Sequence, residues 1–322
     1  MYTHKDLEYR TIFVINCIKS RNLRVSNGEL LLEDAEERKT LTKMPFQKML
    51  ALFVVGSISV TTPLIEKCKQ NNVALVVLKP NLRPVFYWSS SAEANYLLRK
   101  KQYEYRKEDL SIAKILVQNK IDNQIRLLVK TKQRSNAVVL AVDHLKRASS
   151  TIQGVWEYER LMGLEGLASK YFFEGFFHTS GWNGRQPRVK ADALNATLDI
   201  GYTILFNYLE CFVRMFGFDV YVGVYHRLWF KRKSLICDLI EPFRCIVESR
   251  VRTAFNKKQF KESDFLVIKN EYRLKSECAM DYYQVFYEAL IPYKKEIFLY
   301  VQTYYRCFMQ GKPSTSYPKF EL

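Results

Sequence analysis

The stretch LMGLEGLASKYFFEGF (residues 161–176) has the apolar spacing of a packed helix and carries one carboxylate, Glu165, beside its apolar stripe. Leu161, Leu164 and Ala168 recur at i, i+3 and i+7, which predicts a helix with one face in the core. Taking a carboxylate out of water is costly unless a cation, a metal or a hydrogen-bond donor compensates. Glu165 therefore predicts either a solvated helix end or a bound positive partner.

Composition narrows the class of protein. The chain has 322 residues, 48% of them hydrophobic, with only 12 glycines and 9 prolines, which predicts at least one large core and a division into two domains. Fifty Lys and Arg residues stand against 33 Asp and Glu residues, a formal charge of +17. The basic residues are spread along the whole chain, whereas a membrane-surface protein usually concentrates them on one amphipathic segment. The charge therefore favours a nucleic acid as the partner.

Several classes of site are not indicated. The first residues, MYTHKDLEYR, are charged, and the longest apolar run, Met49 to Val60, is too short to cross a bilayer. We therefore expect a cytoplasmic protein with no membrane role. The seven cysteines form no CxxC pair, which argues against a zinc site or a redox dithiol. The chain has neither a GxxxxGK[ST] nor a GxGxxG motif, so nothing indicates nucleotide-driven chemistry.

The periodicity changes once along the chain. Short β-type runs come first, followed by segments with helical spacing from residue 92 onward. The predicted strands are TIFVIN (11–16), NLRV and ELLL joined by an Asn27-Gly28 turn, LALFVV (50–55), VALVVL (73–78) and PVFYW (84–88), with one helix at 61–72. The fold class is therefore α+β, with an N-terminal β domain (1–91), a larger all-helical C-terminal domain (92–322) and a disordered tail from about residue 311.

The helical part is predicted to open with one long charged helix over residues 93–131. Its basic residues are Arg99, Lys100, Lys101, Arg106, Lys107, Lys114, Lys120, Arg126 and Lys130. Mixed-sign charge on a helix is most often a solvated face, and we favour that interpretation. The segment TSGWNGRQPRVK (179–190) is predicted to be a loop that either contacts DNA or only connects helices.

A second acidic group lies in the segment 217–250. His226 follows an apolar run, and a basic loop separates it from Asp238 and Glu241, which are one helical turn apart. Pro242 is compatible with a helix that begins near Asp238, and both carboxylates would then suit the positive end of the helix dipole. Without further information that structural role is the favoured one, and His226 would be a packed, hydrogen-bonded histidine.

These segments resemble the CRISPR adaptation integrase family, the larger of the two universal spacer-acquisition proteins. The resemblance covers nearly the whole chain and keeps the order and spacing of the family's motifs. It lies in ISVTTPLIEKCKQNNVALVVLKPNLRPV (58–85), LLRKKQYEYRKEDLSIAKILVQNKIDNQIRLL (97–128), GLEGLASKYF (163–172), RVKADALNATLDIGYTIL (188–205), GFDVYVGVYH (217–226) and SLICDLIEPFR (234–244).

The resemblance implies a metal-dependent DNA endonuclease and integrase with an N-terminal β-sandwich and a helical catalytic domain. It places the metal ligands on Glu165, His226 and Glu241, with Asp238 at an acidic position of less settled role. It further implies a prokaryotic homodimer, formed through this architecture, that works with a small ferredoxin-like partner. Pro242 departs from the acidic or polar residue that the family often has there.

The donor set also has chemical consequences of its own. Two carboxylates and an imidazole can hold Mg²⁺ or Mn²⁺ and leave positions open for phosphate oxygens and a nucleophile. If the nucleophile is a DNA 3′-hydroxyl, the reaction is transesterification; if it is water, the reaction is hydrolysis. Nearby basic residues, among them Arg185, Arg188 and Arg244, are candidate contacts to double-stranded DNA.

Three functions follow as hypotheses. The first is a spacer integrase that joins 3′-hydroxyl ends to a repeat array. The second is a metal-dependent repair nuclease, and the third is a non-catalytic DNA-binding scaffold whose acidic residues only cap helices.

Overall fold

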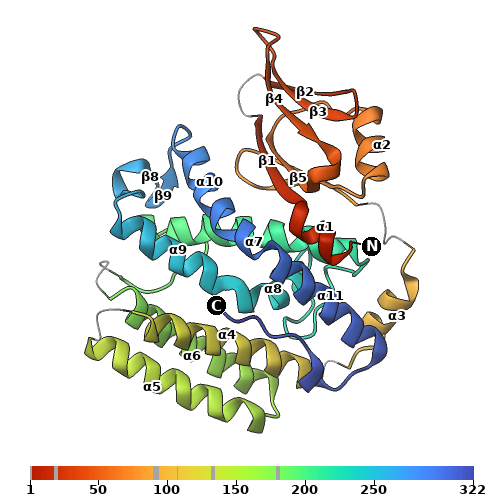
Figure 1. Cartoon of the computed structure of the whole chain (residues 1–322). Coiled ribbons are helices and arrows are strands. Elements are labelled where there is room, and N and C mark those ends of the chain that lie inside the picture. Colours follow the sequence, from red (N-terminus) through yellow and green to blue (C-terminus); the bar gives the residue numbers. More distant parts are fainter. Residues whose placement is uncertain (1, 18–20, 90–93, 107, 132–134, 179–181) are drawn as a thin grey trace.

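A strand-rich N-terminal region packs onto a larger helical region in the computed structural model, which describes residues 2–17, 21–89, 94–106, 108–131, 135–178 and 182–322 (Figure 1). The α+β prediction is confirmed. The predicted domain boundary between residues 91 and 92 falls outside the described residues, so the division into two domains stays a prediction.

The N-terminal region consists of two sheets and two helices. Its elements are α1 (His4–Tyr9), β1 (Thr11–Cys17), β2 (Arg21–Ser26), β3 (Glu29–Asp34), β4 (Thr40–Pro45), the 3-10 helix η1 (Phe46–Lys48), β5 (Met49–Gly56), α2 (Thr62–Gln70), β6 (Ala74–Leu78) and β7 (Pro84–Trp88). One sheet has the order β1-β5-β6-β7, parallel except for β7, and the other is the antiparallel sheet β2-β3-β4. The predicted Asn27-Gly28 hairpin is confirmed, with both residues at positive φ as its turn requires.

The central strands β5 and β6 are buried on both faces, which explains their continuous apolar sequences, whereas the edge strand β7 is largely exposed. Along β5, Leu52 and Val54 pack toward the β2-β3-β4 sheet, whereas Phe53 and Val55 belong to the core shared with the helices. Phe53 stacks on Tyr208, with ring centroids 6.2 Å apart. The two regions therefore share one large core, and a second, smaller core lies within the N-terminal region.

The C-terminal region is helical apart from one hairpin. Its elements are α3 (Tyr96–Glu104), α4 (Ser111–Val129), α5 (Asn136–Thr151), η2 (Ile152–Gly154), α6 (Tyr158–Phe176), α7 (Ala193–Met215), α8 (Ser234–Ile240), η3 (Glu241–Phe243), α9 (Arg244–Asn256), η4 (Glu262–Asp264), β8 (Phe265–Ile268), β9 (Glu271–Leu274), α10 (Ala279–Leu290), η5 (Ile291–Tyr293), α11 (Lys294–Gln310) and η6 (Ser314–Ser316). The β8–β9 hairpin was not predicted. No helix formed by the described residues has the length and apolar character needed to span a membrane.

The single long helix predicted over residues 93–131 is wrong. The chain forms α3 and α4 instead, and between them Tyr105 is extended, at φ −63° and ψ 125°. The carboxylate of Asp109 accepts a hydrogen bond from the backbone N–H of Ser111, 2.9 Å away, at the first residue of α4. Breaking the helix lets α4 turn into the protein, where it packs beside α5 and α6 (Figure 1). It also contacts η3.

The tail predicted to be disordered from about residue 311 is ordered. Tyr317 and Phe320 are buried, and Phe320 packs on Phe243 with ring centroids 4.7 Å apart. Asn119 of α4 pairs with the backbone of Phe320 through two hydrogen bonds, each 2.7 Å long. The prediction failed because the Pro- and Ser-rich composition of the tail concealed two anchoring aromatic side chains.

Candidate metal centre

The carboxylates of Glu165 and Glu241 come from different elements and meet on one lysine. Glu165 lies on α6, Glu241 begins η3, and the ammonium of Lys120, in the middle of α4, pairs with both. The distance from Lys120 Nζ to Glu241 Oε2 is 2.7 Å. The Lys120 side chain is 4% exposed, that of Glu241 7% and that of Glu165 19%. The positive partner that Glu165 requires is therefore present in the chain itself.

The ion pairs decide the protonation states of this group. Burial raises the pKa of Glu241, but Arg244, Lys120 and His226 outweigh burial and lower that pKa to about 2. Burial lowers the pKa of Lys120, but Glu165 and Glu241 outweigh it and raise the pKa above its ordinary value. Glu241 is therefore an anion, and Lys120 a cation, at neutral pH.

Arg244 supplies a second cation. Its Nη1 lies 3.2 Å from both oxygens of Glu241, and its guanidinium lies over the ring of Tyr202, 4.4 Å from the centroid. The Tyr202 hydroxyl in turn donates to Glu248, 2.7 Å away, whose pKa burial raises. Among the predicted DNA contacts, Arg244 thus points into the acidic centre, whereas Arg188 is exposed on the loop before α7.

His226 is held by Asp238. Its Nδ1 lies 2.7 Å from Oδ1 of Asp238, and its side chain is 24% exposed. An ionised carboxylate only accepts hydrogen bonds, so Nδ1 carries a proton, and in the neutral imidazole Nε2 then keeps its lone pair. His226 also lowers the pKa of Glu241, which places the imidazole within electrostatic range of that carboxylate. The imidazole is oriented as a ligand histidine would be.

Asp238 does more than orient one ring. Its oxygens accept backbone N–H bonds from Val224, Tyr225 and His226 at 2.7, 3.0 and 2.8 Å, so it fixes the whole loop before His226. The prediction that a helix begins near Asp238 is wrong, because α8 begins at Ser234 and Asp238 lies in its last turn. Pro242 instead lies in the first turn of η3. Asp238 therefore does not lie at a helix N-terminus, whereas Glu241 lies in the first turn of η3, where the dipole role still applies to it.

Gly223 is required at its position because the Asp238 carboxylate lies against it. A Cβ at Gly223 would come within 2.4 Å of Asp238 Oδ2. We expect Gly223→Ala to destabilise the protein by about 1–3 kcal/mol, since the methyl group must push Asp238 off the loop amides. A thermal melt measures this, with Gly163→Ala on α6 as the control because its Cβ would meet no atom within 4 Å. Equal melting temperatures for the two variants would contradict this account.

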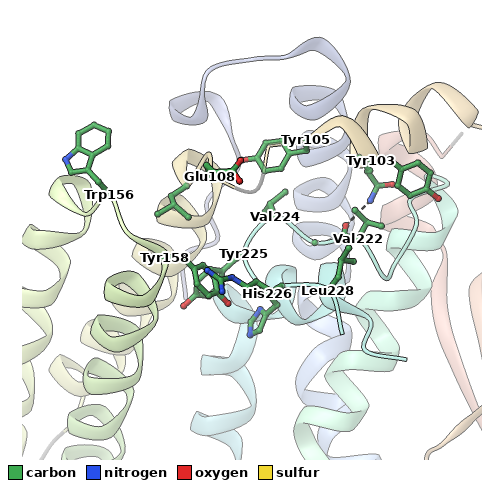
Figure 2. A pocket seen from close by; sticks show the side chains of 14 residues that line it. Tyr103, Tyr105, Glu108, Trp156, Tyr158, Val222, Val224, Tyr225, His226 and Leu228 are labelled. Carbon is green, nitrogen blue, oxygen red and sulfur yellow. Dashed lines mark hydrogen bonds between the residues drawn. The ribbon is translucent and has the colours of Figure 1, made fainter. Parts of the chain in front are cut away.

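A cavity of about 490 Å³ opens beside His226. Figure 2 shows His226 at its wall, next to Tyr158 and Tyr225, with Trp156 at the far side. Arg227 of the cavity wall stacks on Tyr158, 4.1 Å from the ring centroid, and is 61% exposed. The cavity therefore reaches His226 and offers aromatic rings and an exposed cation, while Glu165 and Glu241 are not among the residues that line it.

The two tryptophans of the basic loops differ. Trp182 packs between Phe173 and Phe177, with ring centroids 5.3 Å apart in each pair. Trp229 is 75% exposed and is followed by Phe230, which is 83% exposed. Of these two tryptophans, Trp229 is the one placed where it can stack on another molecule.

The donor set fits a divalent cation, although the carboxylates hold Lys120. Among the described parts of the chain, no three His, Cys, Asp or Glu side chains already form a metal-binding group. Glu165 and Glu241 nevertheless converge on a cation, and His226 offers Nε2. Oxygen donors with one imidazole suit Mn²⁺ or Mg²⁺. The assignment of Glu165, His226 and Glu241 as ligands stays a prediction.

Polar side chains along α7 form a network closed by Arg185. This residue, predicted as a phosphate contact, donates to Asp199 at 2.5 Å and to Asn195 at 2.9 Å. Asp192 accepts from the backbone N–H of Asn195, 2.6 Å away, and thus caps α7. Arg185 therefore ties the loop before α7 to that helix.

Lys120 is the residue of this centre that the sequence analysis missed. Its helix was predicted to be a solvated face, yet Asn119, Lys120, Asn123 and Gln124 are all buried in it. The sequence signal was weak, because half of residues 115–128 (ILVQNKIDNQIRLL) are polar and their spacing does not show which of them are buried. A buried polar side chain needs a partner, and Lys120 finds two in Glu165 and Glu241.

Comparison with known proteins identifies the family. The family model described as "CRISPR associated protein Cas1" matches residues 17–288. The chain belongs to the Cas1 family, the CRISPR adaptation integrases. The CRISPR-associated endonuclease Cas1 1 of Thermodesulfovibrio yellowstonii is 28% identical over 234 residues, 69% of this Cas1 chain and 74% of its own length.

Two solved structures show how closely the fold follows that of other proteins. One, a "Partial Cas6-RT-Cas1--Cas2 complex", has a TM-score of 0.74 and 20% identity, covering 97% of this chain and 99% of that chain. The other, a "Casposase bound to integration product", also has a TM-score of 0.74 and 20% identity, covering 97% and 94%. At these identities the two structures establish the fold alone.

Proposed function

We propose that this Cas1 chain is a metal-dependent DNA endonuclease and integrase that joins 3′-hydroxyl ends of spacer DNA to a repeat array. The observation that carries the proposal is the convergence of Glu165 and Glu241 on one cation beside an imidazole fixed by Asp238. The family membership supports the same chemistry. A role in capping a helix is not supported for Asp238, which lies in the last turn of α8, whereas Glu241 lies in the first turn of η3.

Glu165, His226 and Glu241 would hold Mg²⁺ or Mn²⁺. When bound, such an ion polarises a phosphoryl oxygen and stabilises the charge of the attacking and leaving oxygens. Glu241 offers a full negative charge at any physiological pH, because its pKa is about 2. Asp238 keeps the proton of the neutral His226 imidazole on Nδ1, so the lone pair of Nε2 would be available to the ion.

The joining reaction needs no nucleotide. The 3′-hydroxyl oxygen forms a bond to phosphorus while the bond from phosphorus to the leaving 3′ oxygen breaks, and the hydroxyl proton passes to that leaving oxygen or to solvent. One phosphodiester replaces another, so ATP is not required. With water in place of the 3′-hydroxyl, the same arrangement would cleave DNA as an endonuclease.

Duplex DNA is the proposed substrate, and its binding would depend on the basic surface. Arg227 is exposed near the cavity beside His226, and Arg188 is exposed on the loop before α7. Both can contact DNA phosphates there. A casposase of the same fold was solved bound to its integration product, which supports this role.

The proposed assembly is a homodimer that works with a small ferredoxin-like partner. The solved complex of Cas6-RT-Cas1 with Cas2 supports a Cas2 protein as that partner. We propose that the strand-rich N-terminal region provides the dimer and partner contacts.

Metal binding is the first test of this proposal. We expect Mn²⁺ at about one hundred times its Kd to stabilise the fold by about 2.7 kcal/mol, because it binds the folded chain and not the unfolded one. A thermal melt with and without Mn²⁺ measures this, with Na⁺ at matched ionic strength as the control. An unchanged melting temperature would instead favour a non-catalytic DNA-binding protein.

The products distinguish joining from simple cleavage. A labelled duplex with free 3′-hydroxyl ends is incubated with a supercoiled plasmid that carries a repeat array, the partner protein and Mn²⁺. Branched, labelled plasmid products indicate strand transfer. Cleaved DNA without branched products would indicate the repair nuclease instead.

A further inference from the structure

Lys120 occupies the place where the two proposed carboxylate ligands converge. Its ammonium donates to Glu165 and lies 2.7 Å from Glu241 Oε2, and the side chain is 4% exposed. Arg244 also pairs with Glu241, so the two carboxylates are balanced by two cations. The carboxylate pair is therefore neutralised by the chain itself.

The helix that carries Lys120 is held on both sides of this residue. Asn119 is paired with the backbone of Phe320, and Asn123 donates to the carbonyl oxygens of Pro242 and Phe320, both at 3.0 Å. These bonds tie α4 to the residue after Glu241 and to the tail. Since α4 cannot slide or turn without breaking them, the flexible side chain of Lys120 is the part that can leave the carboxylates.

We propose that Lys120 is a built-in counter-cation that a divalent ion must displace in order to bind, and that it thereby sets the metal affinity of the centre. This inference rests on the proposed metal site. An ammonium and a metal ion cannot occupy the same point between two carboxylates. If Lys120, Arg244 and a divalent ion were all present, their four positive charges would face only the two negative charges of Glu165 and Glu241.

The displaced ammonium has a use near DNA. It is a flexible point charge that binds phosphate well. When the ammonium leaves Glu165 and Glu241, a DNA phosphate at the centre can replace them as its anionic partner. Lys120 therefore makes metal binding easier when DNA is present than when it is absent.

The test is the affinity for Mn²⁺ without DNA, measured by titration calorimetry. We expect Lys120→Met to bind Mn²⁺ about tenfold or more tightly than the parent, because no charge-assisted bonds must be broken first. Lys114→Met is the matched control on the same helix. The Lys114 ammonium lies over the ring of Trp156, 4.5 Å from its centroid, and donates to the carbonyl of Gln153, so this variant should keep the parent affinity.

The melting temperature of the Lys120→Met variant, with and without Mn²⁺, is a second measurement. Without metal, Lys120→Met leaves Glu165 and Glu241 facing each other, so its melting temperature should be lower than the parent's, and Mn²⁺ should raise it more. If Lys120→Met does not fold without metal, Lys120→Gln, whose amide can donate to one carboxylate, provides the same comparison of affinities.

The outcomes separate this inference from the proposed function. Absence of Mn²⁺ binding to the parent would remove the metal site itself. Binding to the parent with an equal or weaker affinity in the folded Lys120 variants would overturn the role of Lys120 and leave the metal site in place.

Discussion

Alanine in place of His226 is expected to reduce strand joining about 10³-fold or more while leaving duplex DNA binding nearly unchanged. Loss of one ligand removes several kcal/mol of transition-state stabilisation, and about 4 kcal/mol corresponds to roughly a 10³-fold lower rate. DNA affinity depends mainly on phosphate contacts spread over the basic surface, which this substitution does not touch. The measurements are the joining rate with labelled 3′ ends and the Kd for a duplex of the same length.

The fold should survive this substitution. Asp238 keeps three backbone N–H donors when the imidazole is removed, so its carboxylate is not left without partners. His4→Ala is the matched control, because His4 is exposed on α1 in the N-terminal region. Joining by the His226 variant at the parent rate would remove this residue from the centre.

Periodicity predicted the parts of the fold that depend on one local pattern. The apolar spacing around Glu165 predicted α6, and the Asn27-Gly28 pair predicted the β2–β3 hairpin, because each signal lies within a few residues. The strands β5 and β6 were predicted for the same reason. Such patterns indicate which face of an element is buried, but they do not identify the neighbour that covers it.

The partners in the centre lie beyond that limit. Glu165 was predicted to need a positive partner, but Lys120 is 45 residues away in sequence and looked like one charge of many on a solvated helix. Asp238 and Glu241 were predicted to lie one turn apart on the same helix. In the structure α8 ends before Glu241, and the two carboxylates have different partners, His226 for Asp238 and Lys120 for Glu241. Their roles depend on tertiary contacts, which spacing alone cannot supply.

Asparagine in place of Asp238 is expected to have the largest effect on stability. The Asp238 carboxylate is completely buried and accepts three backbone N–H bonds and one from His226. An amide has only one acceptor oxygen, and its NH₂ group would face donors. Loss of buried, charge-assisted bonds costs roughly 2–4 kcal/mol in total. The melting temperature should fall by about 3 to 6 °C in a thermal melt, since the unfolding entropy of a chain of this length is roughly 0.7 kcal/mol/K.

The same substitution should also weaken metal binding and joining, each by about 10- to 100-fold, because the loop and the imidazole lose the group that orients them. These quantities are measured well below the melting temperature, so a global loss of fold does not contribute. Asp143→Asn, an exposed aspartate on α5, is the control for the change in charge. A purely structural role predicts a lower melting temperature with parent-like Mn²⁺ affinity in the folded variant. A loss in both shows that Asp238 positions His226, because the carboxylate itself makes no contact with Glu165 or Glu241 among the hydrogen bonds and ion pairs of the described residues.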